Sequence, residues 1–80
     1  METVDDRRTV PLLSSALKDE ASEVRVAACD RLAKLGAKEA IGGLDALLSD
    51  SSFYVKHAAA AALHHLGDDR GVDVLFKGLR

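Results

Sequence analysis

Two stretches of this sequence, SEVRVAACDRLAKLG at residues 22–36 and FYVKHAAAAALHHLG at residues 53–67, decide the fold. In each stretch, apolar residues recur at three- and four-residue spacings, which predicts an α-helix with one buried face. Each stretch ends in Leu-Gly, and glycine readily adopts the left-handed conformation that terminates helices. The two stretches begin 31 residues apart, which indicates two copies of one structural unit.

The repeat extends beyond these stretches, since a shift of 31 residues aligns the first two copies with nine identical residues in 31 positions. A shorter apolar stripe with i, i+3, i+7 spacing precedes each long helix and appears once more near the end of the chain. Its members are Val10, Leu13 and Leu17, then Ile41, Leu44 and Leu48, then Val72, Leu75 and Leu79. The pattern therefore predicts stacked helical hairpins and the start of a third copy.

The predicted fold class is all-α, an α-solenoid of about two and a half hairpins. Five helices are expected, and they cover residues 9–19, 22–35, 38–49, 53–66 and 69–79. Ser22 and Ser52 are the expected N-caps of the two long helices. Residues 1–8 form a predicted flexible segment, and residues 9–80 form the repeat domain. Within that domain, the predicted boundaries are 9–36 for hairpin 1, 37–67 for hairpin 2 and 68–80 for a half repeat.

The expected core follows from the same periodicity. In the long helices it consists of Val24, Ala27, Ala28, Leu32 and Leu35, with Val55, Ala58, Ala59, Ala62, Leu63 and Leu66 in the second copy. Arg31 stands where the second copy has Ala62, so we expect a solvated flank there. Adjacent Gly42 and Gly43 weaken their helix by roughly 1 kcal/mol each, and we interpret them as a means of close helix approach.

Composition excludes several classes of partner. The formal charge of −2 over 80 residues does not favour phosphate backbones or anionic membrane surfaces. No apolar run reaches the ~20 residues that span a bilayer. The single cysteine, Cys29, has no internal disulfide partner. We therefore predict a cytoplasmic protein without a nucleic-acid or membrane partner.

Several short segments resemble the HEAT-like repeat of phycobilisome-lyase subunits and bacterial scaffold proteins. They are the hinges Leu17-Lys18-Asp19 and Leu48-Ser49-Asp50, the pairs Val24-Arg25 and Val55-Lys56, and the closing Leu-Gly turns. The resemblance implies a right-handed superhelix whose second helices line the inner surface. It also implies that Asp19 and Asp50 bind the backbone at the next helix start, near Arg25 and Lys56.

A helical projection of the second helices predicts the functional surface. The side opposite the expected core carries Tyr54, His57, Ala61, His64 and His65 in one helix, and Glu23, Val26, Asp30, Ala33 and Lys34 in the other. We interpret eight of these residues, all but Glu23 and Lys34, as the site where a concave face binds a protein or peptide partner. Tyr54 is the sharpest candidate because tyrosine is favoured at binding hot spots. The alternative is that Tyr54 only packs on Phe53.

The sequence predicts no catalytic residue, cofactor or metal site. His57 and His64 lie two helical turns apart, roughly 10 Å, which is too far for one ion to bridge readily. Cys29 has no histidine near it in sequence and is expected to be a half-buried structural thiol. The predicted function is a noncatalytic scaffold module.

Two further hypotheses are kept. The resemblance to the lyase repeat implies the rival function, a fragment or subunit of a HEAT-repeat lyase-like enzyme assembly. Self-association as a homo-oligomer through the C-terminal helix is a separate prediction, motivated by Val74 and Phe76.

Overall fold

The structure, a computed structural model, describes residues 9–72, and all of its regular elements are helical. The α-helices are α1 Val10–Ala16, α2 Ser22–Lys34, α3 Ile41–Ala46 and α4 Phe53–His65, with 3-10 helices η2 Lys38–Ala40 and η3 Leu47–Ser49 on either side of α3. The described residues thus hold four α-helices instead of five. Residues 69–71 are not helical and Val72 is, whereas residues 73–79 of the predicted fifth helix lie outside the described residues, as does segment 1–8.

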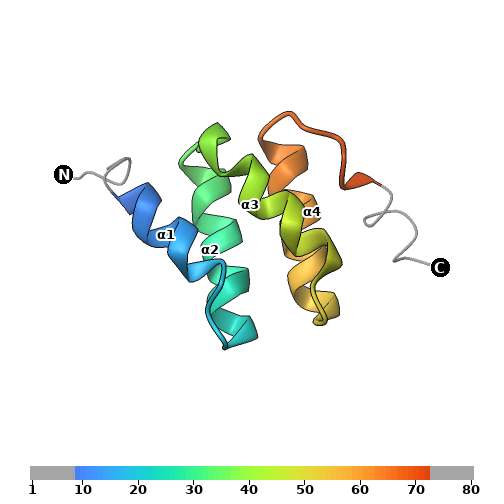
Figure 1. Cartoon of the computed structure of the whole chain (residues 1–80). Coiled ribbons are helices and arrows are strands. Elements are labelled where there is room, and N and C mark those ends of the chain that lie inside the picture. Colours follow the sequence, from blue (N-terminus) through green and yellow to red (C-terminus); the bar gives the residue numbers. More distant parts are fainter. Residues whose placement is uncertain (1–8, 73–80) are drawn as a thin grey trace.

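The two long helices form one layer of the molecule. Helix α2 packs against both α1 and α4, and α3 packs against α4, whereas α1 and α3 make few contacts with each other. Figure 1 shows the chain passing back and forth, so that α2 and α4 run in the same direction. None of the helices within residues 9–72 has the length and apolar character that crossing a bilayer requires.

The ends of the long helices are built alike. Gly36 and Gly67 have φ values of 67° and 87°, as the Leu-Gly endings predict. Ala37 N–H donates to Leu32 O at 3.0 Å, and the corresponding bond after Gly67 measures 2.8 Å. These bonds satisfy carbonyls that a helix end otherwise leaves without partners. The sequence prediction of both turns is confirmed.

The starts of the long helices differ. The Ser52 hydroxyl accepts a bond from Val55 N–H at 3.4 Å, so Ser52 caps α4 as predicted. The prediction for Ser22 is wrong, because Ser22 is already helical and Ala21 holds the cap position. Asp19 Oδ1 instead accepts from Ala21 N–H at 2.8 Å. A carboxylate in the hinge therefore binds the backbone just before α2, and no side chain caps the first turn of that helix.

The core is a seam of small and branched apolar side chains between the helices. Its largest fully buried members are Leu32, Leu44, Leu63, Val55 and Cys29. Two residues of the predicted core are exposed: Val24 keeps 38 % of its surface, and Ala27 faces the gap between α2 and α4. The repeat pattern places both on the apolar side of α2, but burial depends on which neighbours cover that side. Arg31 is exposed, as expected.

The predicted third helix is interrupted. Only six residues are α-helical, and a 3-10 turn lies at each end. A Cβ atom on Gly43 would lie 3.0 Å from Leu17 Cδ1, whereas one on Gly42 would meet nothing within 4 Å. Close approach therefore accounts for Gly43 and not for Gly42.

Candidate functional site

A groove of about 500 Å³ runs between α2 and α4. Six residues of α2 and four of α4 line it: Glu23, Val26, Ala27, Asp30, Ala33 and Lys34, then Ala58, Ala61, Ala62 and His65. The groove lies in the layer of second helices, where the sequence analysis expected the functional surface.

The floor of the groove consists of small apolar side chains. Ala33 and Ala62 are buried, with 7 % and 4 % of their surface exposed, and Val26 and Ala58 are half-buried. Ala27 and Ala61 are exposed along the opening. Because alanine side chains are short, the floor has room for a larger apolar group from outside.

Charged and polar side chains form the rim. Glu23, Asp30 and Lys34 stand on the α2 side, and His65 stands on the α4 side. Lys34 Nζ lies 3.4 Å from Asp30 Oδ2, with both side chains well exposed. An exposed i, i+4 pair of this kind is worth only about 0.3–0.5 kcal/mol, so it restrains the two groups weakly.

The structure brings together five of the eight predicted site residues: Val26, Asp30, Ala33, Ala61 and His65. Ala33 belongs to the floor because it is nearly covered. Tyr54, His57 and His64 are exposed but do not line the groove. Tyr54 lies one turn before Ala58 on the groove side of α4, whereas His64 faces elsewhere.

An aromatic cluster occupies the first turns of α4. The ring of Phe53 lies 6.5 Å from that of Tyr54 in an edge-on arrangement, and 6.2 Å from the ring of His57. Tyr54 therefore packs on Phe53, as the alternative interpretation had it, yet keeps 79 % of its surface exposed. Phe53 is the residue that the sequence analysis missed, although its i, i+4 spacing to His57 indicated a contact.

His64 lies at a different surface. It lines a shallow depression with residues of the loop after α4, namely Gly67, Asp68, Asp69 and Arg70. Arg70 Nε donates to Asp68 Oδ1 at 2.9 Å, and its backbone N–H donates to the same oxygen. These bonds hold the pKa of Asp68 below its ordinary value. The loop is therefore organised by its own ion pair rather than by His64.

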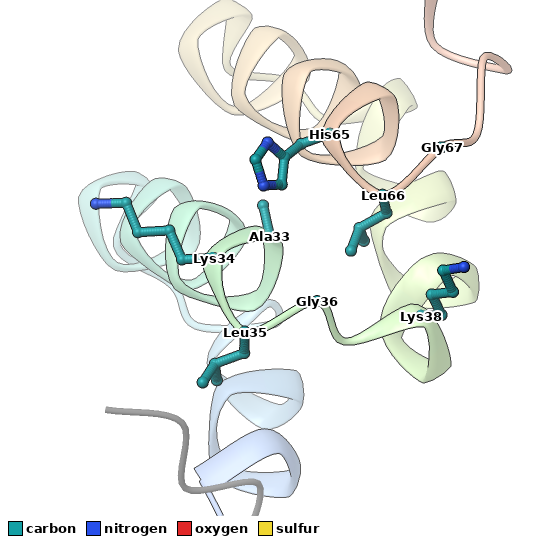
Figure 2. A pocket seen from close by; sticks show the side chains of 8 residues that line it. All are labelled: Ala33, Lys34, Leu35, Gly36, Lys38, His65, Leu66 and Gly67. Atoms are coloured by element: carbon teal, nitrogen blue, oxygen red, sulfur yellow. The ribbon is translucent and has the colours of Figure 1, made fainter. Parts of the chain in front are cut away.

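A second cavity, of about 610 Å³, opens at the C-terminal ends of α2 and α4. It shares Ala33, Lys34 and His65 with the groove and thus continues it. Figure 2 shows the His65 ring directed toward Ala33 across the space between the two helices. Lys34, Lys38 and His65 make this end basic, which suits the negative end of a helix dipole.

Cys29 has no surface exposed, so it is more deeply buried than the sequence analysis expected. Burial raises the pKa of its thiol to about 11, and the nearby Asp50 and Asp30 charges contribute in the same direction. A neutral, covered thiol is a poor nucleophile, so the structure argues against a catalytic role. Among residues 9–72, no group of three potential metal ligands gathers at one place.

Two models of known protein families match this chain. A model described as HEAT repeats matches residues 1–63, and a model described as PBS lyase HEAT-like repeat matches residues 55–79. The chain belongs to the HEAT-repeat family. No curated protein matches the chain, and no solved structure matches it. HEAT repeats generally mediate protein interactions, so the family assignment draws attention to the surface of the second helices.

The HEAT resemblance placed Asp50 near Lys56 of its own repeat, and the structure adds an ion pair with the preceding repeat. Arg25 Nη2 lies 3.0 Å from Asp50 Oδ1. The contact is an ion pair without hydrogen-bond geometry, since Asp50 Oδ1 has no hydrogen-bond partner among the described residues. Arg25 Nη1 also donates to Asp19 O at 2.6 Å. Arg25 thus connects the hinges of two successive HEAT hairpins.

Proposed function

We propose that this HEAT-repeat chain is a noncatalytic interaction module, a short solenoid that binds a peptide or protein partner in the groove between α2 and α4. The observation that carries the proposal is the combination of a floor of alanine and valine with a charged rim, on the side where the sequence pattern places the concave face. Protein-binding surfaces have this anatomy of an apolar centre and a polar edge.

The dimensions of the groove favour a helical or extended peptide. Helices α2 and α4 have thirteen residues each, and the groove extends along them from Glu23 to Lys34. Amphipathic helices bind such channels by placing large side chains of one face into them. Tyr54 and Phe53, exposed at 79 % and 52 %, lie at the start of α4 and extend the available apolar area.

The lyase-like alternative rests on the name of the family model that matches residues 55–79. Among residues 9–72, no hydrogen bond described joins a serine or cysteine side chain to a histidine, and the groove floor is aliphatic. These observations favour binding over catalysis. The interaction module is therefore the leading proposal.

The test uses two matched arginine substitutions. Ala61 and Ala46 are both exposed helical alanines, but Ala61 lines the groove and Ala46 belongs to α3. Peptides selected from a random displayed library on the wild-type chain are titrated against the Ala61→Arg and Ala46→Arg variants. We expect Ala61→Arg to weaken binding at least about tenfold, and Ala46→Arg to change it less than about twofold.

Two results would contradict the proposal. One is the absence of any enriched peptide, and the other is equal affinity for the wild-type chain and the Ala61→Arg variant. Helical circular dichroism of both variants checks that an arginine has not unfolded the chain.

A further inference from the structure

The two ends of the groove carry opposite charge. At the end where α2 and α4 begin, the rim holds the carboxylate of Glu23, and Tyr54 occupies the equivalent repeat position. At the end where both helices finish, it holds Lys34 and, at the equivalent position, His65. Helices α2 and α4 run in the same direction (Figure 1). Because the members of each pair hold equivalent repeat positions, we place them at one height along the groove.

The middle of the groove adds little to this polarity. Asp30 is the one further charged residue among those that line it, and Lys34 lies 3.4 Å away as its ion-pair partner. An approaching ligand therefore meets Glu23 at one end and an apolar floor. At the other end it meets the Asp30–Lys34 ion pair together with His65 and with Lys38 of the adjoining cavity, so basic residues outnumber acidic ones there. Figure 2 shows this end, with the His65 ring directed toward Ala33 and Lys34 extending outward from the end of α2.

The spacing of the charges fixes the length of a matching ligand. Glu23 and Lys34 are eleven residues apart on one helix. At 1.5 Å per residue, this separation corresponds to about 16 Å, or three turns of a partner helix. Partner helices place acidic side chains most favourably in their first turn and basic ones in their last.

The helix dipoles of the protein favour the same arrangement. The positive ends of α2 and α4 lie at the Glu23 end, and their negative ends lie at the Lys34 end. A partner helix that runs antiparallel to both brings its own positive end to their negative ends. Its basic last turn then faces Glu23 and the ring of Tyr54, a combination that attracts Lys or Arg.

We propose that the groove selects an amphipathic helix of about three turns that lies antiparallel to α2 and α4, with acidic residues at its N-terminal end and basic residues at its C-terminal end. This inference rests on the proposed function and adds the chemistry and direction of the partner. Leucine or phenylalanine side chains from one face of that helix pack on the small side chains that line the groove, Ala27, Ala58 and Ala61.

The experiment uses a designed helical peptide of about fourteen residues, long enough for the three turns and their ends. It carries two Glu in its first turn, two Arg in its last turn, Leu at i, i+3, i+7 spacing and a nitroxide label at its C-terminus. Amide signals of the ¹⁵N-labelled chain are recorded with the label oxidised and reduced. We expect the oxidised label to broaden the amides around Glu23 and Tyr54 more strongly than those around Lys34 and His65.

A double charge reversal, Glu23→Lys with Lys34→Glu, supplies the decisive comparison. If charge sets the direction, the broadening moves toward residues 34 and 65 in this variant. The single Glu23→Lys change is expected to weaken binding about three- to tenfold, while the matched Glu20→Lys change at the exposed hinge leaves it within about twofold.

The outcomes separate the two proposals. Stronger broadening at the Lys34 end of the wild-type chain, equal broadening at both ends, or no binding of the designed peptide would overturn the inference about polarity. The proposed function survives these results if library-selected peptides still require Ala61. It fails if those peptides bind the Ala61→Arg variant as tightly as the wild-type chain, whatever the designed peptide does.

Discussion

Helices α2 and α4 occupy equivalent positions in successive repeats, yet the same residue position differs between them in burial and partners. Val24 of α2 keeps 38 % of its surface exposed, whereas the equivalent Val55 of α4 is fully covered. Leu32 and Leu63, by contrast, are both fully buried. The repeat pattern therefore determines which residues are buried in the centre of the core. At the edges of the core, burial depends on whether a neighbouring helix covers that position.

The basic residue after each of these valines differs in the same way. Arg25 bonds to the hinge carbonyls and reaches Asp50 of the next hairpin, with 15 % of its side chain exposed. Lys56, at the equivalent position, is half-buried, and no ion pair to it is described among residues 9–72. Coupling between the two hairpins therefore depends on Arg25 and not on Lys56.

The largest expected effect comes from breaking that coupling. Arg25→Ala leaves the Asp50 carboxylate buried without a counter-charge and removes two bonds to hinge carbonyls, so the free energy of unfolding falls by about 2–4 kcal/mol. The matched Lys56→Ala change costs less than about 1 kcal/mol. Urea denaturation measures both; equal costs would mean that Arg25 does not couple the hairpins.

The next largest effect is expected at the equivalent valines, Val55 and Val24, which differ in burial. Val55→Ala removes two buried carbons and leaves a cavity, which costs roughly 2–3 kcal/mol. Val24→Ala acts on a side chain that is partly in water and costs less than about 1 kcal/mol. Thermal melting of the two variants is the measurement, and a reversed order would show that burial along α2 and α4 has been assigned wrongly.

A third contrast concerns tolerance of a methyl group beside α4. A Cβ atom on Gly71 would lie 2.8 Å from Ala60 Cα, so Gly71→Ala forces a backbone shift and costs roughly 1–3 kcal/mol. Gly42→Ala has open space in a helix and is expected to stabilise by about 0.5–1 kcal/mol. Denaturant midpoints of the two variants should therefore move in opposite directions, and movement in the same direction contradicts the close approach.

The smallest effect concerns Cys29, whose equivalent in α4 is Ala60. The pKa of the buried thiol is raised from 9.0 to about 11, so the folded state holds its proton more tightly than the unfolded state. Stability is therefore unaffected below pH 9 and falls as the pH rises from 9 to 11. Unfolding curves across this range should be flatter for Cys29→Ala, and identical pH dependence in both proteins would contradict the burial of the thiol.

Much of the fold could be predicted from the sequence because short-range signals determine it. The apolar periodicity identified the two long helices nearly to the residue, and the Leu-Gly endings identified Gly36 and Gly67. The interruption of the third helix could not be predicted from the sequence. The 3-10 turns lie at residues 38–40 and 47–49, whereas Gly42 and Gly43, the residues expected to weaken this helix, are in its α-helical part.

The candidate site could be predicted only in part. A helical projection gives the side on which a residue stands, and it correctly placed Val26, Asp30 and Ala61 beside one another across two helices. It gives no depth, so Ala33 was expected at the surface and Ala27 in the core. Which of these residues touch a partner is still a prediction.

Chemical-shift mapping with a library-selected peptide tests the central claim, that the surface between the second helices is the binding site, most directly. The account predicts that the largest changes fall on the amides and methyl groups of Val26, Ala27, Ala58 and Ala61, with little change on α1 or α3. Changes centred on α1, around its exposed Leu12, would contradict it.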